Sequence, residues 1–175
     1  MNRYIALLRG INVGGHKKIL MKDLRSLLES IGLSTVTTYI QSGNIVFDSN
    51  KKVGLDALIS EAIKNKYGWE VPVLVLTASQ IATILSNCPF SEEKMEKSYF
   101  TIFKEEPSEA NIAAANGIQY PGEEFYVTKE CLYFYSETGY SRVKMSGNFV
   151  ESKLKVNATS RNYRTMAKLL DMASV

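Results

Sequence analysis

The sequence predicts an α+β fold whose first half is a ferredoxin-like, split βαβ unit. Apolar runs of strand length alternate with amphipathic helices in the order β-α-β-β-α-β over residues 4–76. The same order recurs with weaker signals over residues 99–173, where a final helix takes the place of the last strand. We therefore predict a second, related α+β half that arose as a degenerate duplication of the first.

Six segments make up the first half, and each is read from its apolar periodicity. In order they are a strand over residues 4–8, a helix over 21–31, strands over 36–41 and 44–47, a helix over 55–66 and a strand over 71–76. The two middle strands are joined by the tight turn Gln41-Ser42-Gly43-Asn44. Because both crossover connections contain a helix, we expect strand one to be central and to pair in parallel with strands three and four.

The chain after the fourth strand begins with a third helix, in which Thr77 and Gln80 have the spacing of a capping box. The charged residues 91–97 then indicate a boundary, so we predict domains over residues 1–90 and 91–175. In the second domain we predict a strand over residues 99–103, a helix over 108–116, a hairpin over 125–127 and 132–135, a short helix over 148–154 and a C-terminal helix over 161–173. The aromatic residues of the hairpin are expected to pack within the fold.

Composition argues against several classes of protein. The 175 residues carry a net charge of +3, well short of the Lys and Arg content of a dedicated nucleic-acid binder. Two cysteines, Cys88 and Cys131, with His16 as the only histidine, are too few ligands for a zinc site. A single histidine in a flexible loop also argues against a Ser-His-Asp arrangement or a Cys-His pair. No apolar run approaches the roughly 20 residues of a membrane helix. We therefore expect a soluble cytoplasmic protein with reduced cysteines, no metal and no contact with a membrane.

Three motifs carry a resemblance to a known family. They are Ala6-Leu7-Leu8-Arg9-Gly10-Ile11-Asn12-Val13-Gly14-Gly15, then Thr38-Tyr39-Ile40-Gln41-Ser42-Gly43-Asn44, then Thr159-Ser160-Arg161-Asn162-Tyr163 followed by Lys168-Leu169-Leu170. Across its whole length the chain resembles the bacterial proteins grouped as domain of unknown function 1697, although that family usually has Trp where this chain has Tyr163. The resemblance implies a ferredoxin-like half joined to a second α+β half. It implies no activity, so it assigns neither a catalytic residue nor a cofactor.

The loop after the first strand is the first candidate site. Gly10 and Gly15 have the spacing of a phosphate-binding loop, but His16 and Lys17 follow where that motif needs Lys and then Ser or Thr. The sequence therefore argues against a nucleotide-hydrolysing loop. Two alternatives stay open: glycines that a β-α connection needs for positive φ, or an anion site built from backbone N–H groups and polar side chains. The candidate residues are Arg9, Gly10, Asn12, Gly14, Gly15 and Lys17, with Lys18 beside them.

Three of the polar residues near this loop have two interpretations each. Arg9, at the end of the first strand, either pairs with a carboxylate or faces a ligand. Asn12 and Gln41 either contact a ligand or order the backbone of the loop and of the hairpin. We include all three among the predicted ligand-binding residues.

The start of the predicted C-terminal helix is the second candidate site. Thr159 or Ser160 is positioned to cap it, and Arg161 and Asn162 fall in its first turn, where free N–H groups attract anions. Arg161, Thr165 and their neighbours Arg164 and Lys168 would lie on one helical face. Arg142 and Lys144, from the preceding loop, are predicted to join this basic cluster. The alternative is an ordinary solvated basic face.

We hypothesise that both candidate sites face one cleft between the halves, because both are polar and basic. The favoured function is binding of a phosphate- or carboxylate-bearing ligand, either a small molecule such as a nucleotide or a nucleic-acid backbone. One alternative is an enzyme that stabilises charge on an anionic small molecule. The other is a homo-oligomeric interaction module. The catalytic residues and the cofactor stay unknown from sequence.

Overall fold

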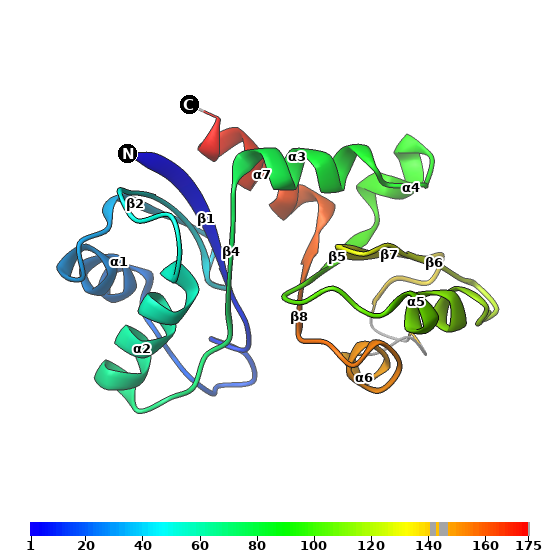
Figure 1. Cartoon of the computed structure of the whole chain (residues 1–175), viewed down its shortest axis with the longest axis horizontal. Helices are drawn as coiled ribbons and strands as arrows, with labels where there is room; N and C mark the ends of the chain where they lie inside the picture. Colours follow the sequence, from blue (N-terminus) through cyan, green and yellow to red (C-terminus); the bar gives the residue numbers. More distant parts are fainter. Residues whose placement is uncertain (141–142, 144–146, 175) are drawn as a thin grey trace. The chain divides into compact units, whose positions relative to one another are not determined.

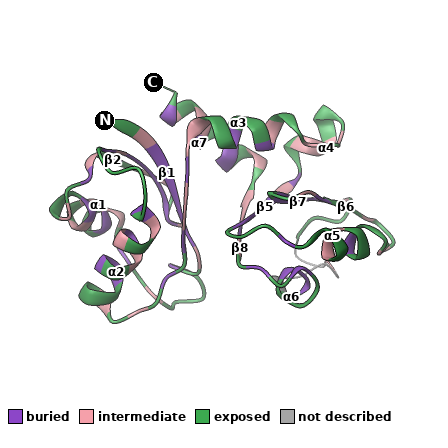
Figure 2. Ribbon diagram, in the orientation of Figure 1, coloured by how far each residue is buried: buried purple, intermediate pink, exposed green. Residues whose placement is uncertain are grey.

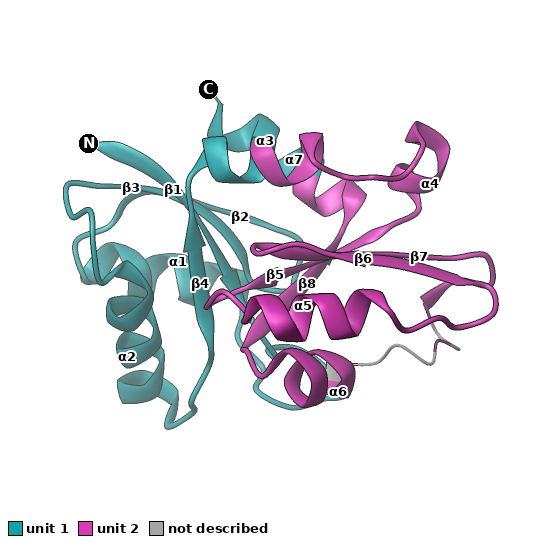
Figure 3. Cartoon of the chain, turned by 45° about the vertical axis from the view of Figure 1, so that its right-hand side comes forward, with its two compact units in different colours: residues 1–82, 167–175 teal, residues 83–166 magenta. Residues whose placement is uncertain are grey.

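The computed structural model of the chain contains two four-stranded antiparallel sheets with associated helices (Figure 1). The structure describes residues 1–140, 143 and 147–174. The chain divides into unit 1, Met1–Ala82 with Ala167–Val175, and unit 2, Thr83–Met166 (Figure 3). The predicted α+β fold of two related halves is confirmed, because both sheets have the strand order of a ferredoxin-like unit.

Unit 1 contains the six elements that the sequence predicts. They are β1 (Asn2–Leu8), α1 (Met21–Ser30), β2 (Ser34–Tyr39), β3 (Asn44–Ser49), α2 (Leu55–Tyr67) and β4 (Val73–Leu76), and the sheet order is β2-β3-β1-β4. Two further helices, α3 (Ala78–Ser86) and α7 (Tyr163–Ala173), cross from one unit to the other along the chain.

The neighbours of β1 run antiparallel to it, so the predicted parallel pairing is wrong. Leu7 pairs with Asn44 of β3 on one side and with Leu74 of β4 on the other, both in antiparallel ladders. Each helical connection joins strands that are separated by a third: α1 links β1 to β2, with β3 between them, and α2 links β3 to β4, with β1 between them. The strand β1 is nevertheless interior, as predicted, and its carboxyl end opens into the loop before α1.

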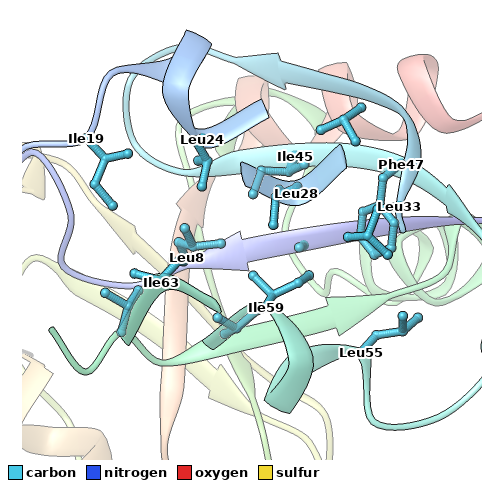
Figure 4. Packing of buried hydrophobic residues seen from close by; sticks show 14 of the residues in the cluster. Leu8, Ile19, Leu24, Leu28, Leu33, Ile45, Phe47, Leu55, Ile59 and Ile63 are labelled. Carbon is cyan, nitrogen blue, oxygen red and sulfur yellow. The ribbon is translucent and has the colours of Figure 1, made fainter. Parts of the chain in front are cut away.

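One face of the sheet in unit 1 packs against α1 and α2 (Figure 4). Leu24 and Leu28 of α1 and Ile59 and Ile63 of α2 are fully buried, and the spacing of four places each pair on one side of its helix. Burying each side chain is worth about 2 kcal/mol relative to leaving it exposed. Burial also extends along β1 (Figure 2), so the end of this strand is a fixed platform for the loop that follows.

The helix α3 starts as the sequence predicts. The Thr77 N–H donates to Gln80 Oε1 at 2.9 Å, and the Gln80 N–H donates to Thr77 Oγ1 at 3.3 Å. These reciprocal hydrogen bonds form the expected capping box. Farther on, the charged residues 91–97 contain the short helix α4 (Glu92–Glu96). Acidic residues in its first turn favour that helix through the helix dipole.

Unit 2 repeats the arrangement of unit 1. After α4 it contains β5 (Tyr99–Phe103), α5 (Glu109–Asn116), β6 (Glu123–Val127), β7 (Cys131–Ser136), α6 (Gly147–Phe149), the π-helical η2 (Val150–Leu154) and β8 (Ala158–Asn162). The sheet order β6-β7-β5-β8 matches β2-β3-β1-β4 strand for strand. The predicted helix over residues 148–154 is therefore a single α-helical turn that continues as a π-helical turn.

Strand β8 occupies the segment in which we predicted the start of the C-terminal helix, and that prediction is wrong. Arg161 pairs with Phe100 and Ser160 with Thr101 of β5, so unit 2 has its fourth strand. The segment Ala-Thr-Ser-Arg-Asn is polar and passes into α7 without a connecting loop. It therefore lacks both the apolar pattern and the turn residues by which a strand is recognised.

Most of the aromatic side chains of the β6–β7 hairpin pack within unit 2 as predicted, but Tyr126 is 48% exposed. Phe125 meets Phe149 in a T-shaped contact with ring centroids 5.3 Å apart, and Phe134 is buried in the same core. The Tyr133 hydroxyl is also buried and donates to the Ile84 carbonyl at 2.8 Å. Burial raises the pKa of Tyr133, which is the expected effect for a phenol in an apolar setting.

Candidate functional site

The loop after β1 has a backbone conformation that favours glycine at three positions. Gly10, Gly14 and Gly15 have φ of 75°, 58° and 78°, in the left-handed region that other residues rarely adopt. The loop folds back on itself where the His16 N–H donates to the Val13 carbonyl at 3.0 Å. The conformational role, one of the two alternatives for these glycines, is therefore observed.

Asn12 ties this loop to the start of α1 and to the β2–β3 hairpin. Its Oδ1 accepts the Ile19 N–H at 2.9 Å, and its Nδ2 donates to the carbonyls of Ile19 at 3.0 Å and Gln41 at 2.7 Å. Its own N–H donates to the Lys17 carbonyl at 3.2 Å. The structure thus shows Asn12 ordering the backbone, and Gln41 takes part through its main chain.

The hairpin between β2 and β3 packs directly on the end of β1. The Leu8 N–H donates to the Gly43 carbonyl at 2.8 Å, and a side chain on Gly43 would meet Leu8 Cβ at 2.6 Å. Next to it, the buried Asn44 side chain donates to the Tyr39 carbonyl at 3.1 Å and to Ser42 Oγ at 2.9 Å. These two residues hold the hairpin in place under the loop; the sequence predicted both as turn residues but did not indicate these contacts.

A pocket of about 760 Å³ lies beside the end of β1, wholly within unit 1. Its lining residues are Arg9, Gly10, Lys17, Ala57, Ser60, Glu61, Lys64, Glu70, Val71 and Pro72. They come from the end of β1 and its loop, from α2 and from the connection between α2 and β4. The Arg9 N–H donates to the Pro72 carbonyl at 3.0 Å, and Ser60 Oγ donates to the Val71 carbonyl at 2.8 Å. These bonds join the three segments into one wall.

Two lysine side chains of the pocket converge on Glu70. Lys17 Nζ donates to the Glu70 carbonyl at 2.6 Å, and Lys64 Nζ contacts Glu70 Oε1 at 2.8 Å. The hydrogen bond from Lys64, with a smaller effect of the Lys17 charge, lowers the pKa of the Glu70 carboxyl. The Lys64 and Glu70 side chains are 58% and 82% exposed, so water screens the pair and it adds little stability.

The pocket contains only part of the predicted site, and it contains groups that were not predicted. Arg9, Gly10 and Lys17 line it, whereas the other predicted loop and hairpin residues, Asn12, Gly14, Gly15 and Gln41, do not. Lys64 was missed because a cation in the last turn of a helix is ordinary, since it complements the helix dipole. Glu70 was missed because only the tertiary fold brings the connection before β4 to the first loop.

The second predicted site differs from its prediction in local structure. Arg161 lies in β8 and its Nη1 donates to the Ser160 carbonyl at 2.9 Å, while Ser160 Oγ and Thr101 Oγ1 share a hydrogen bond at 2.6 Å. Burial lowers the pKa of Arg161 to about 10. The N-cap of α7 is instead Asn162, whose Oδ1 accepts the N–H of the buried Thr165 at 2.9 Å. Arg161 therefore does not stand at a helix N-terminus.

The remaining predictions for this second site are not addressed by the described part of the chain. Arg142 and Lys144 lie outside the described residues. Arg9 belongs to unit 1 and Arg161 to unit 2, so their shared cleft stays a prediction.

Across residues 1–140, 143 and 147–174, no helix is long and apolar enough to cross a membrane, and no three His, Cys, Asp or Glu side chains could together hold a metal ion.

Comparison with known proteins gives a family and a fold. A family model described as "Protein of unknown function (DUF1697)" matches residues 1–133. The chain is similar to a solved structure, the conserved bacterial protein SP0830 from Streptococcus pneumoniae, with 26% sequence identity and a TM-score of 0.73. That similarity covers 100% of this chain and 99% of the other. No curated protein matches the chain.

Proposed function

Since the chain belongs to the family of proteins of unknown function called DUF1697, we propose its function from its geometry: it binds a small phosphate- or carboxylate-bearing ligand in the pocket of unit 1. The observation that carries this proposal is the convergence of Lys17 and Lys64 on Glu70, beside Arg9 at the end of β1. Three cations of the lining outnumber its two carboxylates, Glu61 and Glu70. An anion is therefore the complementary ligand.

The Glu70 carboxylate occupies a position in which a ligand anion would be stabilised. Lys64 holds it at 2.8 Å in water-screened surroundings, so an incoming phosphate can exchange for it at small cost. Lys17 is already held in place by its bond to the Glu70 carbonyl and does not need the carboxylate. An anion that replaces the carboxylate would therefore have both ammonium groups within reach.

Backbone strain supports the same site. Lys17 has φ 47°, a left-handed conformation that costs a residue with a side chain about 1–2 kcal/mol. Such strain persists where the surrounding structure imposes it, and it is concentrated at functional sites. Here the strained residue is one that lines the pocket and bonds to the Glu70 carbonyl. The pocket volume of about 760 Å³ is within the range of small-molecule sites and is sufficient for a nucleotide-sized ligand.

The enzyme alternative would use the same cations as electrostatic stabilisers. The lowered pKa of Glu70 keeps this carboxylate ionised and makes it a weak base at neutral pH. Binding is therefore the function that the pocket supports best, and charge stabilisation is the chemistry that a reaction here would use.

Lys17→Gly is expected to weaken binding of inorganic pyrophosphate about tenfold, as for the loss of one charge-assisted hydrogen bond. Glycine adopts the φ of residue 17 without strain, so the free energy of unfolding should stay within about 1 kcal/mol of wild type. Isothermal titration calorimetry at low salt measures the affinity. Lys18→Ala is the matched control, because Lys18 is exposed and does not line the pocket. Equal losses in the two variants, or no binding by the wild type, would contradict the proposal.

Self-association is the second candidate function, and an exposed apolar cluster favours it. Val13, Leu20 and Ile40 are 65%, 68% and 52% exposed. They are the sequence neighbours of Asn12, Ile19 and Gln41, which the side-chain hydrogen bonds of Asn12 connect. Ile40 has φ 49°, so Ile40→Asn removes an apolar side chain where asparagine tolerates the backbone. Sedimentation velocity should then show weaker association at high concentration than in the wild type. A wild type that is monomeric at every concentration would dispose of this candidate.

A further inference from the structure

Strand β6 is an edge of the sheet in unit 2, and half of its backbone groups face away from β7. The Thr128 N–H donates to the Cys131 carbonyl at 2.9 Å, which fixes the phase of the ladder between the two strands. Residues of an antiparallel strand alternate in the direction of their backbone groups. The N–H and C=O groups of Glu123, Phe125 and Val127 therefore point outward, toward the open edge.

The chain itself covers two of these three outward positions. The Asn116 side chain acts like a neighbouring strand at Val127: Oδ1 accepts the Val127 N–H at 2.8 Å and Nδ2 donates to the Val127 carbonyl at 2.9 Å. At the other end, the Glu123 N–H donates to the Tyr120 carbonyl at 3.2 Å. Phe125 lies between them, and within the described part of the chain its outward N–H and C=O have no hydrogen-bond partner.

A second pocket, of about 530 Å³, lies along this open position. Side chains of a strand alternate between the two faces of its sheet, yet the pocket is lined by four successive residues of β6, from Glu123 to Tyr126. Phe90 and the segment that includes Tyr120 supply further walls. Because residues from both faces line it, the hollow follows the edge of the strand. This is where the backbone of an added strand would lie.

The lining of this pocket is aromatic and acidic. Glu123 and Glu124 are charged residues of its lining, and none of the described residues that line it is Lys, Arg or His. The protein already places one of its own cations in such surroundings next to the pocket: Lys94 Nζ is 2.5 Å from Glu124 Oε1 and 5.3 Å from the ring centre of Tyr135. A carboxylate together with an aromatic face is a favourable environment for an ammonium or guanidinium group.

We propose that the edge of β6 is a docking site for an extended peptide segment of a partner protein that carries Lys or Arg. The segment adds a short strand at Phe125, whose N–H and C=O pair with one of its residues. A neighbouring cationic side chain of the segment then contacts the carboxylates of Glu123 and Glu124 and the aromatic walls. The Asn116 and Tyr120 contacts limit main-chain pairing to this one position, so the site selects for the cationic side chain and the association is weak and reversible.

The test is amide hydrogen exchange of the full chain with the peptide acetyl-Ala-Lys-Ala-Lys-Ala-amide. At a concentration that fills four fifths of the sites, exchange of the Phe125 amide should slow about fivefold. The same peptide with glutamate in place of lysine should leave it unchanged. Unchanged exchange at Phe125 with the lysine peptide at millimolar concentration would overturn the proposal.

Two further measurements separate the main-chain and side-chain contributions to peptide binding. N-methylation of the peptide at its central residue removes a backbone donor, so that peptide should bind more weakly, and equal binding would overturn strand addition. Glu123→Gln should weaken binding of the lysine peptide about threefold, the usual effect of one exposed ion pair. Glu106→Gln, an exposed carboxylate of the same unit that does not line the pocket, is the control. Equal effects of the two substitutions would overturn the charge recognition.

Discussion

Replacing Gly43 with alanine is expected to lower the free energy of unfolding by about 4 kcal/mol. Two costs add at this position. The residue has φ 78°, and the new Cβ would stand 2.6 Å from Leu8 Cβ and 3.0 Å from Ile11 Cδ1, both in the core beneath the loop. The first atom belongs to the buried end of β1, which cannot move without separating the hairpin from the strand.

Urea denaturation followed by circular dichroism measures this loss. The matched control is Gly15→Ala, because Gly15 has the same φ of 78° but no atom within 4 Å of the position of a new Cβ. Its free energy of unfolding should fall only by the cost of the left-handed backbone conformation, about 1–2 kcal/mol. If the two variants lose equal stability, close packing at Gly43 is not what holds the hairpin against β1.

Asn12→Ala should lower the free energy of unfolding by about 3 kcal/mol. The change removes three side-chain hydrogen bonds and leaves the N–H of the buried Ile19 without its acceptor. It also places alanine at φ 56°, where asparagine is tolerated. Because the Asn12 N–H bonds the Lys17 carbonyl, we expect the variant to weaken pyrophosphate binding as well.

Asn12→Gly divides this effect into its two parts. Glycine keeps the backbone conformation and loses only the hydrogen bonds, so it should recover about 1 kcal/mol relative to alanine. Equilibrium unfolding of both variants in urea supplies the comparison. Wild-type stability in either variant would show that the loop does not depend on these bonds.

Much of the fold could be predicted because its signals are local. The stripes that include Leu24 and Leu28 in α1 and Ile59 and Ile63 in α2, and the aliphatic run of β1, depend only on residues near in sequence. The strand β8 was not predictable in the same way. It is a polar segment that becomes a strand because β5 offers it a partner, and that partner lies more than 50 residues away.

The same difference between local signals and tertiary contacts applies to the residues of the candidate site. Arg9, Gly10 and Lys17 were predicted because they belong to the loop that follows a buried strand. Lys64 and Glu70 come to the same pocket through the packing of α2 and its connection to β4, which leaves no trace in a local pattern. Asn12 and Gly43 are intermediate cases: both belong to motifs that are visible in the sequence, but the residues that they contact are distant in the chain.

The most direct test of anion binding in unit 1 is an amide NMR titration of the full chain with inorganic pyrophosphate. We expect saturable shifts at Gly10, Lys17, Ser60 and Glu70, which line the pocket, with little change elsewhere in unit 1. Because charge carries the interaction, these shifts should weaken as salt is raised from low to physiological ionic strength. The absence of saturable shifts at these four amides, or shifts of similar size at exposed lysines such as Lys51 and Lys52, would contradict it.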